Sequence, residues 1–149
     1  ADEMLRAMRS SISVGDSLLL GADLVKPEAE LQLAYDDPLG VTAAFNRNLL
    51  VRLNRELDAT FDLGGFVHRA VWDAAASRVE MHLVGTRRQR VTIPSVALDI
   101  TLEDGETIWT ESSYKYEPRD LESMLKRAGF RVAAQWTDDG FALTLGTAE

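Results

Sequence analysis

Glu111 and Ser113 stand two residues apart in a stretch, Glu106–Tyr116, whose alternation predicts a β-strand. Successive residues of a strand point to opposite faces, so Glu111 and Ser113 share one face. A carboxylate and a hydroxyl at this spacing suit a small planar ring with two nitrogens. The carboxylate accepts a ring N–H, and the hydroxyl donates to the second nitrogen or accepts from it. Pattern alone favours an edge strand whose Glu and Ser face water, and ring binding stays open beside it.

Other residues that could be catalytic or bind a metal are either absent or not spaced as such sites require. The sequence has no cysteine, which excludes disulfides, thiolate catalysis and zinc–sulfur sites. The two histidines, His68 and His82, fall on separate predicted strands with no carboxylate at ligand spacing, so we expect no metal site. Asp36 and Asp37 are adjacent and therefore point apart, which argues against a carboxylate pair for acid–base catalysis. No catalytic residue is assigned from the sequence.

Composition narrows the kind of partner. A formal net charge of −8 argues against a nucleic acid as partner. The one basic cluster, Arg87–Arg90, follows a Gly-Thr turn and predicts a solvated hairpin. No apolar run approaches the roughly 20 residues of a membrane helix, so we expect no membrane partner. The absence of cysteine and of a recognisable signal peptide favours a cytoplasmic protein.

A long helix, predicted from about Leu39 to Leu57, is the first element that must position these groups. The Tyr-Asp-Asp-Pro sequence at residues 35–38 precedes it and marks a turn. Apolar residues recur at i+4 spacing and predict one buried stripe, made of Val41, Phe45, Leu49, Leu53 and Leu57. Asn46, Arg47 and Asn48 are more polar than a packing helix needs, and we interpret them as a network that ties two lobes together.

After this helix, apolar residues recur at every second position, which is the spacing typical of β-strands. Val79, Met81 and Leu83 share one face of a cleanly alternating stretch. Turns follow at Asp73–Ser77, Gly85-Thr86 and Asp104-Gly105. We expect an antiparallel β region with five strands: Phe66–Trp72, Arg78–Val84, Arg90–Pro94, Ala97–Leu102 and Glu106–Tyr116.

At both ends of the chain the sequence predicts helices and strands of the kind found in an α/β sheet. Ser17–Gly21 is an apolar strand without alternation, which is typical of a strand buried on both faces in a parallel sheet. Asp23 and Lys26 follow its carboxyl end, where open α/β sheets place their ligands. The remaining expected elements are helices at residues 1–10, 26–37 and 117–128 and strands at Phe130–Thr137 and Phe141–Leu145.

A helix opened by Tyr-Asp-Asp-Pro and followed closely by Phe-Asn-Arg-Asn, residues 45–48, resembles the histidine-specific N-methyltransferases of ergothioneine biosynthesis. The resemblance runs along nearly the whole chain, but only to the C-terminal half of such an enzyme. It implies transfer of methyl groups from S-adenosylmethionine (SAM) to the α-amino nitrogen of L-histidine. Histidine would then be the small-molecule partner.

The resemblance also implies roles for five residues. Glu111-x-Ser113 matches the imidazole-recognition motif of these enzymes in residue types and spacing, which turns the balance toward substrate binding. Tyr35 matches a tyrosine whose hydroxyl helps hold the substrate carboxylate, Thr42 a residue near the substrate, and Met81 a pocket wall. A local helix cap at Thr42 and an ordinary core methionine at Met81 remain the plainer alternatives.

The fold class implied is α/β. A partial Rossmann-like class I methyltransferase sheet would occupy residues 1–30 and 117–149, and an inserted antiparallel β substrate-recognition lobe would occupy residues 31–116. The chain has no G-x-G pair to approach the cofactor, so we expect it not to bind SAM alone. A sheet without its first four strands should self-associate through its open edge. The competing hypothesis is a non-catalytic α+β binding or regulatory module.

Overall fold

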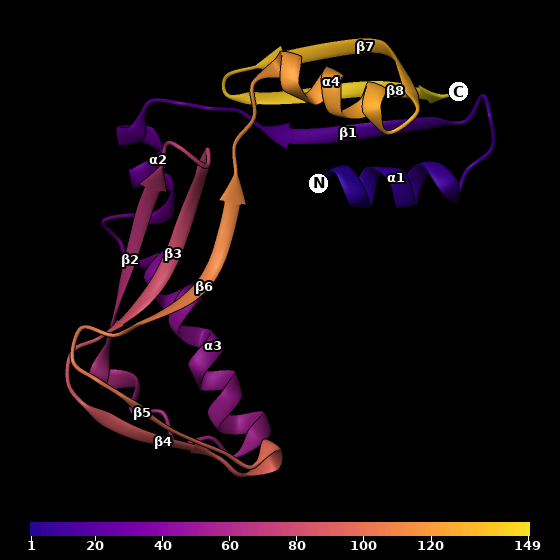
Figure 1. Ribbon diagram of the computed structural model, residues 1–149. Helices are drawn as coiled ribbons and strands as arrows, with labels where there is room; N and C mark the ends of the chain where they lie inside the picture. Colours follow the sequence, from indigo (N-terminus) through magenta and orange to yellow (C-terminus); the bar gives the residue numbers. More distant parts are fainter. The chain divides into compact units, whose positions relative to one another are not determined.

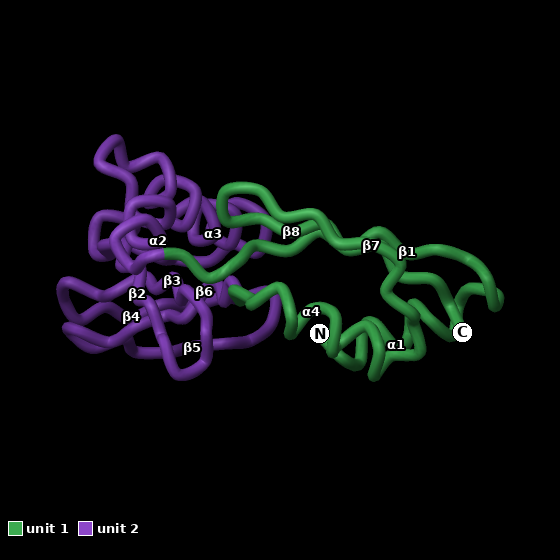
Figure 2. Tube along the Cα trace, turned by 90° about the horizontal axis from the view of Figure 1, so that it is seen from above, with its two compact units in different colours: residues 1–26, 114–149 green, residues 27–113 purple.

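The computed structural model describes all 149 residues and contains four α-helices and eight strands, an α/β composition. The chain separates into two compact units, which Figure 2 shows in green and purple. The first joins Ala1–Lys26 with Tyr114–Glu149, and the second is Pro27–Ser113. No helix is both long and apolar enough to cross a membrane. That these units are a partial methyltransferase sheet and a substrate-recognition lobe stays a prediction.

A three-stranded sheet in the order β1-β8-β7 forms the base of the first unit. Both neighbouring pairs are antiparallel, with Leu20 of β1 opposite Thr144 of β8. Gly140 turns the chain from β7 to β8 at a φ of +83°, a conformation that glycine adopts without strain. The strands are β1 (Ser17–Asp23), β7 (Phe130–Asp138) and β8 (Phe141–Ala148).

Two helices cover one face of this sheet, α1 (Asp2–Ser10) and α4 (Pro118–Arg127). Their apolar sides meet the sheet in one cluster, in which Leu5, Leu125 and Phe130 are almost completely buried. Pro118 stands in the first turn of α4, where its missing N–H costs nothing. Gly129, at a φ of +90°, follows the last turn, as expected from the sequence.

The expectation for β1 was wrong. This strand lies at the edge of the sheet and pairs antiparallel with β8, instead of being buried on both faces in a parallel sheet. Leu18 and Leu20 pack against the helix-covered core, whereas Leu19 between them is 58% exposed. Three consecutive leucines hide this alternation, because an apolar residue on the open face looks the same in the sequence as one in the core.

The second unit packs two helices against a sheet in the order β2-β3-β6 (Figure 1). A separate antiparallel hairpin, β4 with β5, extends from it. The five strands expected in this part of the chain are all present, close to their predicted bounds. The elements are α2 (Glu28–Tyr35), α3 (Val41–Leu57), β2 (Phe66–Asp73), β3 (Arg78–Gly85), β4 (Gln89–Ile93), β5 (Leu98–Leu102) and β6 (Thr107–Tyr114).

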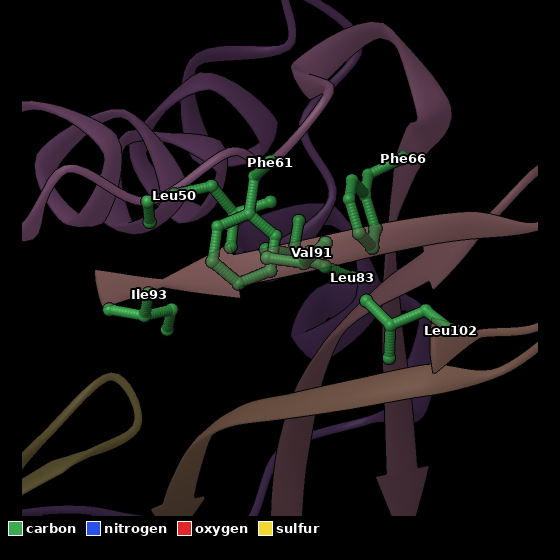
Figure 3. Packing of buried hydrophobic residues seen from close by; sticks show 8 residues of the cluster. Leu50, Phe61, Phe66, Leu83, Val91, Ile93 and Leu102 are labelled. Carbon is green, nitrogen blue, oxygen red and sulfur yellow. The ribbon is translucent and has the colours of Figure 1, made fainter. Parts of the chain in front are cut away.

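One hydrophobic core joins α3 to the sheet and the hairpin of this unit (Figure 3). Leu50 of α3, Leu83 of β3 and Val91 of β4 are each 0% exposed. Full burial of a side chain of this size contributes about 1.5–3 kcal/mol, so these contacts hold the three elements together. The other buried members are Ala59, Phe61, Phe66, Ile93 and Leu102.

The apolar stripe expected along α3 is buried only in its C-terminal half. Leu53 and Leu57 pack against the core, but Val41 and Phe45 are 66% and 67% exposed. The side of α3 that turns inward carries Asn46 and Leu50 instead. Asn46 is buried because it has hydrogen-bond partners there, which an apolar period cannot reveal.

Candidate functional site

A small pocket lies between the N-terminal half of α3 and the strands β3 and β6 of the second unit. Its volume is about 210 Å³, enough for a small planar group. Met81 forms a buried wall, as expected if it were either a core residue or a pocket residue. The lining residues are Phe45, Asn46, Asn48, Leu49, Arg52, Met81, Thr110 and Glu111.

Glu111 brings an exposed carboxylate to this pocket without an ion-pair partner. Two hydrogen bonds fix the strand around it: Thr110 donates its hydroxyl to the Met81 carbonyl at 2.9 Å, and the Trp109 indole N–H donates to the Glu111 carbonyl at 2.9 Å. The backbone is therefore held while the carboxylate stays available. A carboxylate in this state accepts an N–H from a ligand without first losing a protein partner.

Trp109 is held in turn by a charged and aromatic cluster on β3. It stacks on His82 with ring centroids 5.8 Å apart, and the Arg78 guanidinium lies 4.6 Å from the Trp109 ring centre. Glu80 bonds Arg78 at 2.6 Å and His82 at 3.0 Å. Burial raises the pKa of Glu80, but hydrogen bonds from His82 and Arg78 outweigh it and leave this pKa lowered. The cluster cross-links β3 to β6 beside Glu111.

Tyr35 and Ser113 form a second constellation. Tyr35 ends α2, Ser113 lies near the end of β6, and their side-chain oxygens are 2.6 Å apart. These two residues, which only the family resemblance assigned to one site, are in contact although they are far apart in the sequence. Neither of them lines the pocket that holds Met81 and Glu111. The five expected site residues therefore do not form a single lining.

Thr42 lies in the first turn of α3, but it is not the capping residue that the plainer alternative made it. Its backbone N–H donates to the Asp37 carboxylate at 2.8 Å, and the Val41 N–H donates to the same carboxylate at 3.1 Å. These backbone hydrogen bonds, with one from the Thr42 side chain, lower the pKa of Asp37 to about 2. Gly40, at a φ of +72°, lets the chain turn between Asp37 and the helix. Asp37 thus caps the helix that borders the pocket.

Asn46 and His68 were not predicted as site residues. Asn46 is 4% exposed and donates through Nδ2 to His68 Nδ1 at 3.0 Å and to the His82 carbonyl at 3.3 Å. His68 Nε2 lies 2.8 Å from the Tyr35 carbonyl. One signal was available, because Asn46 stands four residues before the core residue Leu50 and so shares its helix face. His68 had no such signal.

The other polar residues of α3 differ from Asn46. Asn48 is exposed and borders the pocket. Arg47 is half-buried, and its Nε has no hydrogen-bond partner. Arg52, also at the pocket, pairs with Glu56 one turn further on at 3.2 Å. The hydrogen bonds of Asn46 all lie within the second unit, so they order this unit.

Comparisons with known proteins give matches that cover nearly the whole chain. A family model described as a histidine-specific, SAM-dependent methyltransferase matches residues 1–148. Histidine N-alpha-methyltransferase of Mycobacterium tuberculosis (strain CDC 1551 / Oshkosh) is 46% identical over 145 residues, which cover 96% of this chain and 45% of that protein. Its counterpart in Mycolicibacterium smegmatis is 44% identical with the same coverage. The chain thus spans about half the length of these curated relatives.

More distant matches cover a smaller share of the proteins they align with or share less of their sequence. Ergothioneine biosynthesis protein 1 of Schizosaccharomyces pombe is 23% identical over 137 residues, which cover 91% of this chain and 18% of that protein. Among solved structures, a SAM-dependent methyltransferase from Clostridium acetobutylicum aligns with 99% of this chain and 50% of its own, at 9% identity and a TM-score of 0.45.

Proposed function

We propose that this chain, which belongs to the family of SAM-dependent histidine-specific methyltransferases, is the C-terminal, histidine-binding part of an enzyme that methylates the α-amino nitrogen of L-histidine. The observation that carries the proposal is the Glu111 carboxylate, which has no ion-pair partner and lines a small pocket together with the buried Met81. The relatives with 44–46% identity are named for methylation of this nitrogen.

Each proposed ligand residue has a distinct task. Glu111 accepts one N–H of the imidazole, Ser113 bonds the other ring nitrogen, and Met81 packs against the ring. Tyr35 directs its hydroxyl to the carboxylate of the amino acid, and Thr42 borders the same end of the substrate. The Tyr35–Ser113 contact supports this division, because it links the residue assigned to the carboxylate with one assigned to the ring.

SAM, the cofactor of this family, supplies the methyl group as an electrophilic sulfonium. The residues of this chain do not fit the cofactor. Asp23, the acid at the end of β1, already binds Lys26 and Lys115 at 2.7 Å each, so it is not free to accept ribose hydroxyls. A Cβ on Gly21 would meet the Phe141 ring at 3.0 Å, so this glycine leaves no open cradle. Cofactor binding is therefore assigned to another part of the enzyme.

The contribution of this chain to the reaction is then to orient the substrate. Methyl transfer needs a neutral amine whose lone pair points along the bond that breaks, and fixed orientation supplies a large part of such rate enhancements. Holding the ring at one end and the carboxylate at the other fixes the amino nitrogen between them.

An NMR titration of the isotope-labelled chain with L-histidine tests the proposal. We expect shifts at Glu111, Ser113 and Met81, and much smaller ones with L-phenylalanine, which has no ring N–H. Glu111→Gln should weaken the response, and Glu122→Gln, a change at a partly exposed carboxylate of the first unit, serves as control. Equal responses to both amino acids, or none, would contradict histidine recognition and favour the non-catalytic module.

A further inference from the structure

Both ring nitrogens of His68 make hydrogen bonds, and these bonds connect His68 to two helices of the second unit. Nε2 lies 2.8 Å from the carbonyl oxygen of Tyr35, the last residue of α2. Nδ1 lies 3.0 Å from Nδ2 of Asn46, on α3. His68 itself belongs to β2, so its ring ties the end of α2 and the N-terminal half of α3 to the sheet. The substrate-binding roles proposed above leave His68 without a role.

The hydrogen-bond partners determine which nitrogen of His68 carries the proton. A carbonyl oxygen only accepts, so Nε2 must donate to Tyr35. The Asn46 amide also faces the His82 carbonyl at 3.3 Å, which requires its NH₂ group on that side. The same NH₂ then donates to Nδ1, which therefore holds a lone pair. These partners place the proton of His68 on Nε2 and a lone pair on Nδ1, and the 4% exposure of Asn46 keeps water from replacing the donor.

This arrangement controls where the Tyr35 side chain lies. The Tyr35 carbonyl is among the last four of α2, which have no partner inside the helix. His68 provides that partner, and the backbone leaves the helix at once, since Asp36 has a φ of −143° and a ψ of 66°. The other end of Tyr35 is its hydroxyl, 2.6 Å from Ser113. Tyr35 is thus held at its backbone from β2 and at its hydroxyl from β6.

We propose that His68, kept by Asn46 in the form protonated on Nε2, is the positioning residue that sets the Tyr35 hydroxyl against Ser113 and thereby shapes the amino-acid end of the substrate site. The effect on substrate rests on the proposed function, whereas the effect on Tyr35 does not. Asn46 acts one step further away, through His68.

The first test needs only the chain. Long-range proton–nitrogen NMR spectra of the His68 ring should show a single form protonated on Nε2, and a ring protonated on Nδ1 would overturn the inference. The carbon that bears the Tyr35 hydroxyl reports its hydrogen bond. Its signal should move in His68→Phe and in Asn46→Ala. It should stay in place in His68→Gln, because a glutamine amide also offers one donor and one acceptor.

Asn54→Ala is the matched control. Asn54 lies on the same helix and also ties to backbone, at the carbonyl and N–H of Phe61 at 2.8 and 2.9 Å. It should lose comparable stability without moving the Tyr35 signal. A Tyr35 signal that stays in place in His68→Phe, or moves equally in Asn54→Ala, would mean that His68 only supports the fold.

L-Histidine affinity extends the test to the substrate. His68→Phe should weaken binding about three- to tenfold, the size of one well-placed hydrogen bond. The same change in a Tyr35→Phe background should cost nothing further, because no hydroxyl is left to position. Equal losses in both backgrounds would contradict the positioning role. A wild-type chain that binds no L-histidine would count against the proposed function, and the Tyr35 signal would then decide the inference alone.

Discussion

The Asp37 carboxylate controls the start of α3, the helix that borders the pocket. Backbone N–H groups of Val41 and Thr42 donate to it and lower its pKa from 3.8 to about 2. Since the folded pKa lies below the unfolded one, its stabilisation is present above about 3.8 and is lost as pH falls through about 2. We expect a carbon NMR titration of Asp37 with a midpoint near 2, together with faster exchange of the Thr42 amide at lower pH.

In Asp37→Asn, which keeps an acceptor at every pH, the Thr42 amide should show no such acid transition. A midpoint near 3.8 for the wild-type carboxylate would contradict the capping role.

A second residue-scale feature is the buried Lys115, whose side chain is 0% exposed and pairs with Asp23 at 2.7 Å. Burial raises the pKa of Asp23, but hydrogen bonds from Lys115 and Lys26 outweigh it and leave this pKa lowered. Asp23→Asn removes the carboxylate that pairs with this buried cation and should cost about 3–5 kcal/mol in urea unfolding. Lys115→Met removes the buried charge itself and should cost less. Equal losses in the two variants would show that the ion pair does not govern stability here.

At the scale of the element, α3 has an inward face that packs and apolar residues outside that face that stay exposed. Leu50 is 0% exposed in the core, so Leu50→Ala should lower the free energy of unfolding by about 2–5 kcal/mol. Val41 is 66% exposed on the same helix, and Val41→Ala should change it by less than about 0.5 kcal/mol. Denaturant titrations of both variants measure the difference. A large loss for Val41→Ala would mean that these exposed residues are covered in solution.

Element types and bounds could be predicted where a local signal determines them. Alternation at Val79, Met81 and Leu83 and the glycine at residue 129 were enough to place β3 and the end of α4. Whether a side chain is buried or exposed could not be predicted where residue type does not distinguish the two. Leu19 is as apolar as its neighbours yet exposed, and Asn46 is polar yet buried, because each depends on what packs beside it.

The candidate site was predictable to a similar depth. Spacing along β6 placed Glu111 and Ser113 on one face but favoured an edge strand facing water. The family resemblance turned the prediction toward substrate binding and added Tyr35, Thr42 and Met81. Pattern could not reveal that Ser113 would meet Tyr35 across 78 positions of sequence. The pattern also could not reveal the role proposed for His68. That role depends on a backbone carbonyl, and the sequence does not show which backbone groups a side chain will meet.

At the scale of the whole molecule, the first unit exposes an open edge and an apolar surface. β1 has a neighbour on one side only, and its sheet carries exposed Leu19, Trp136, Phe141 and Leu143. Edges and patches of this kind promote association. We expect concentration-dependent dimers or larger species in sedimentation velocity, reduced by Leu19→Lys. A single monomeric species over a wide concentration range would refute this expectation.

Recognition of the imidazole by Glu111 is tested most directly in the complete methyltransferase, by comparing kcat/KM for L-histidine with that for L-phenylalanine. A hydrogen bond to a charged group is worth about 1.5–3 kcal/mol, so Glu111→Ala should lower kcat/KM for histidine about ten- to a hundredfold, mainly through KM. The preference for histidine over phenylalanine should shrink in proportion, and Glu122→Ala should leave it unchanged. An unchanged preference in Glu111→Ala would show that Glu111 is only an exposed carboxylate on an edge strand.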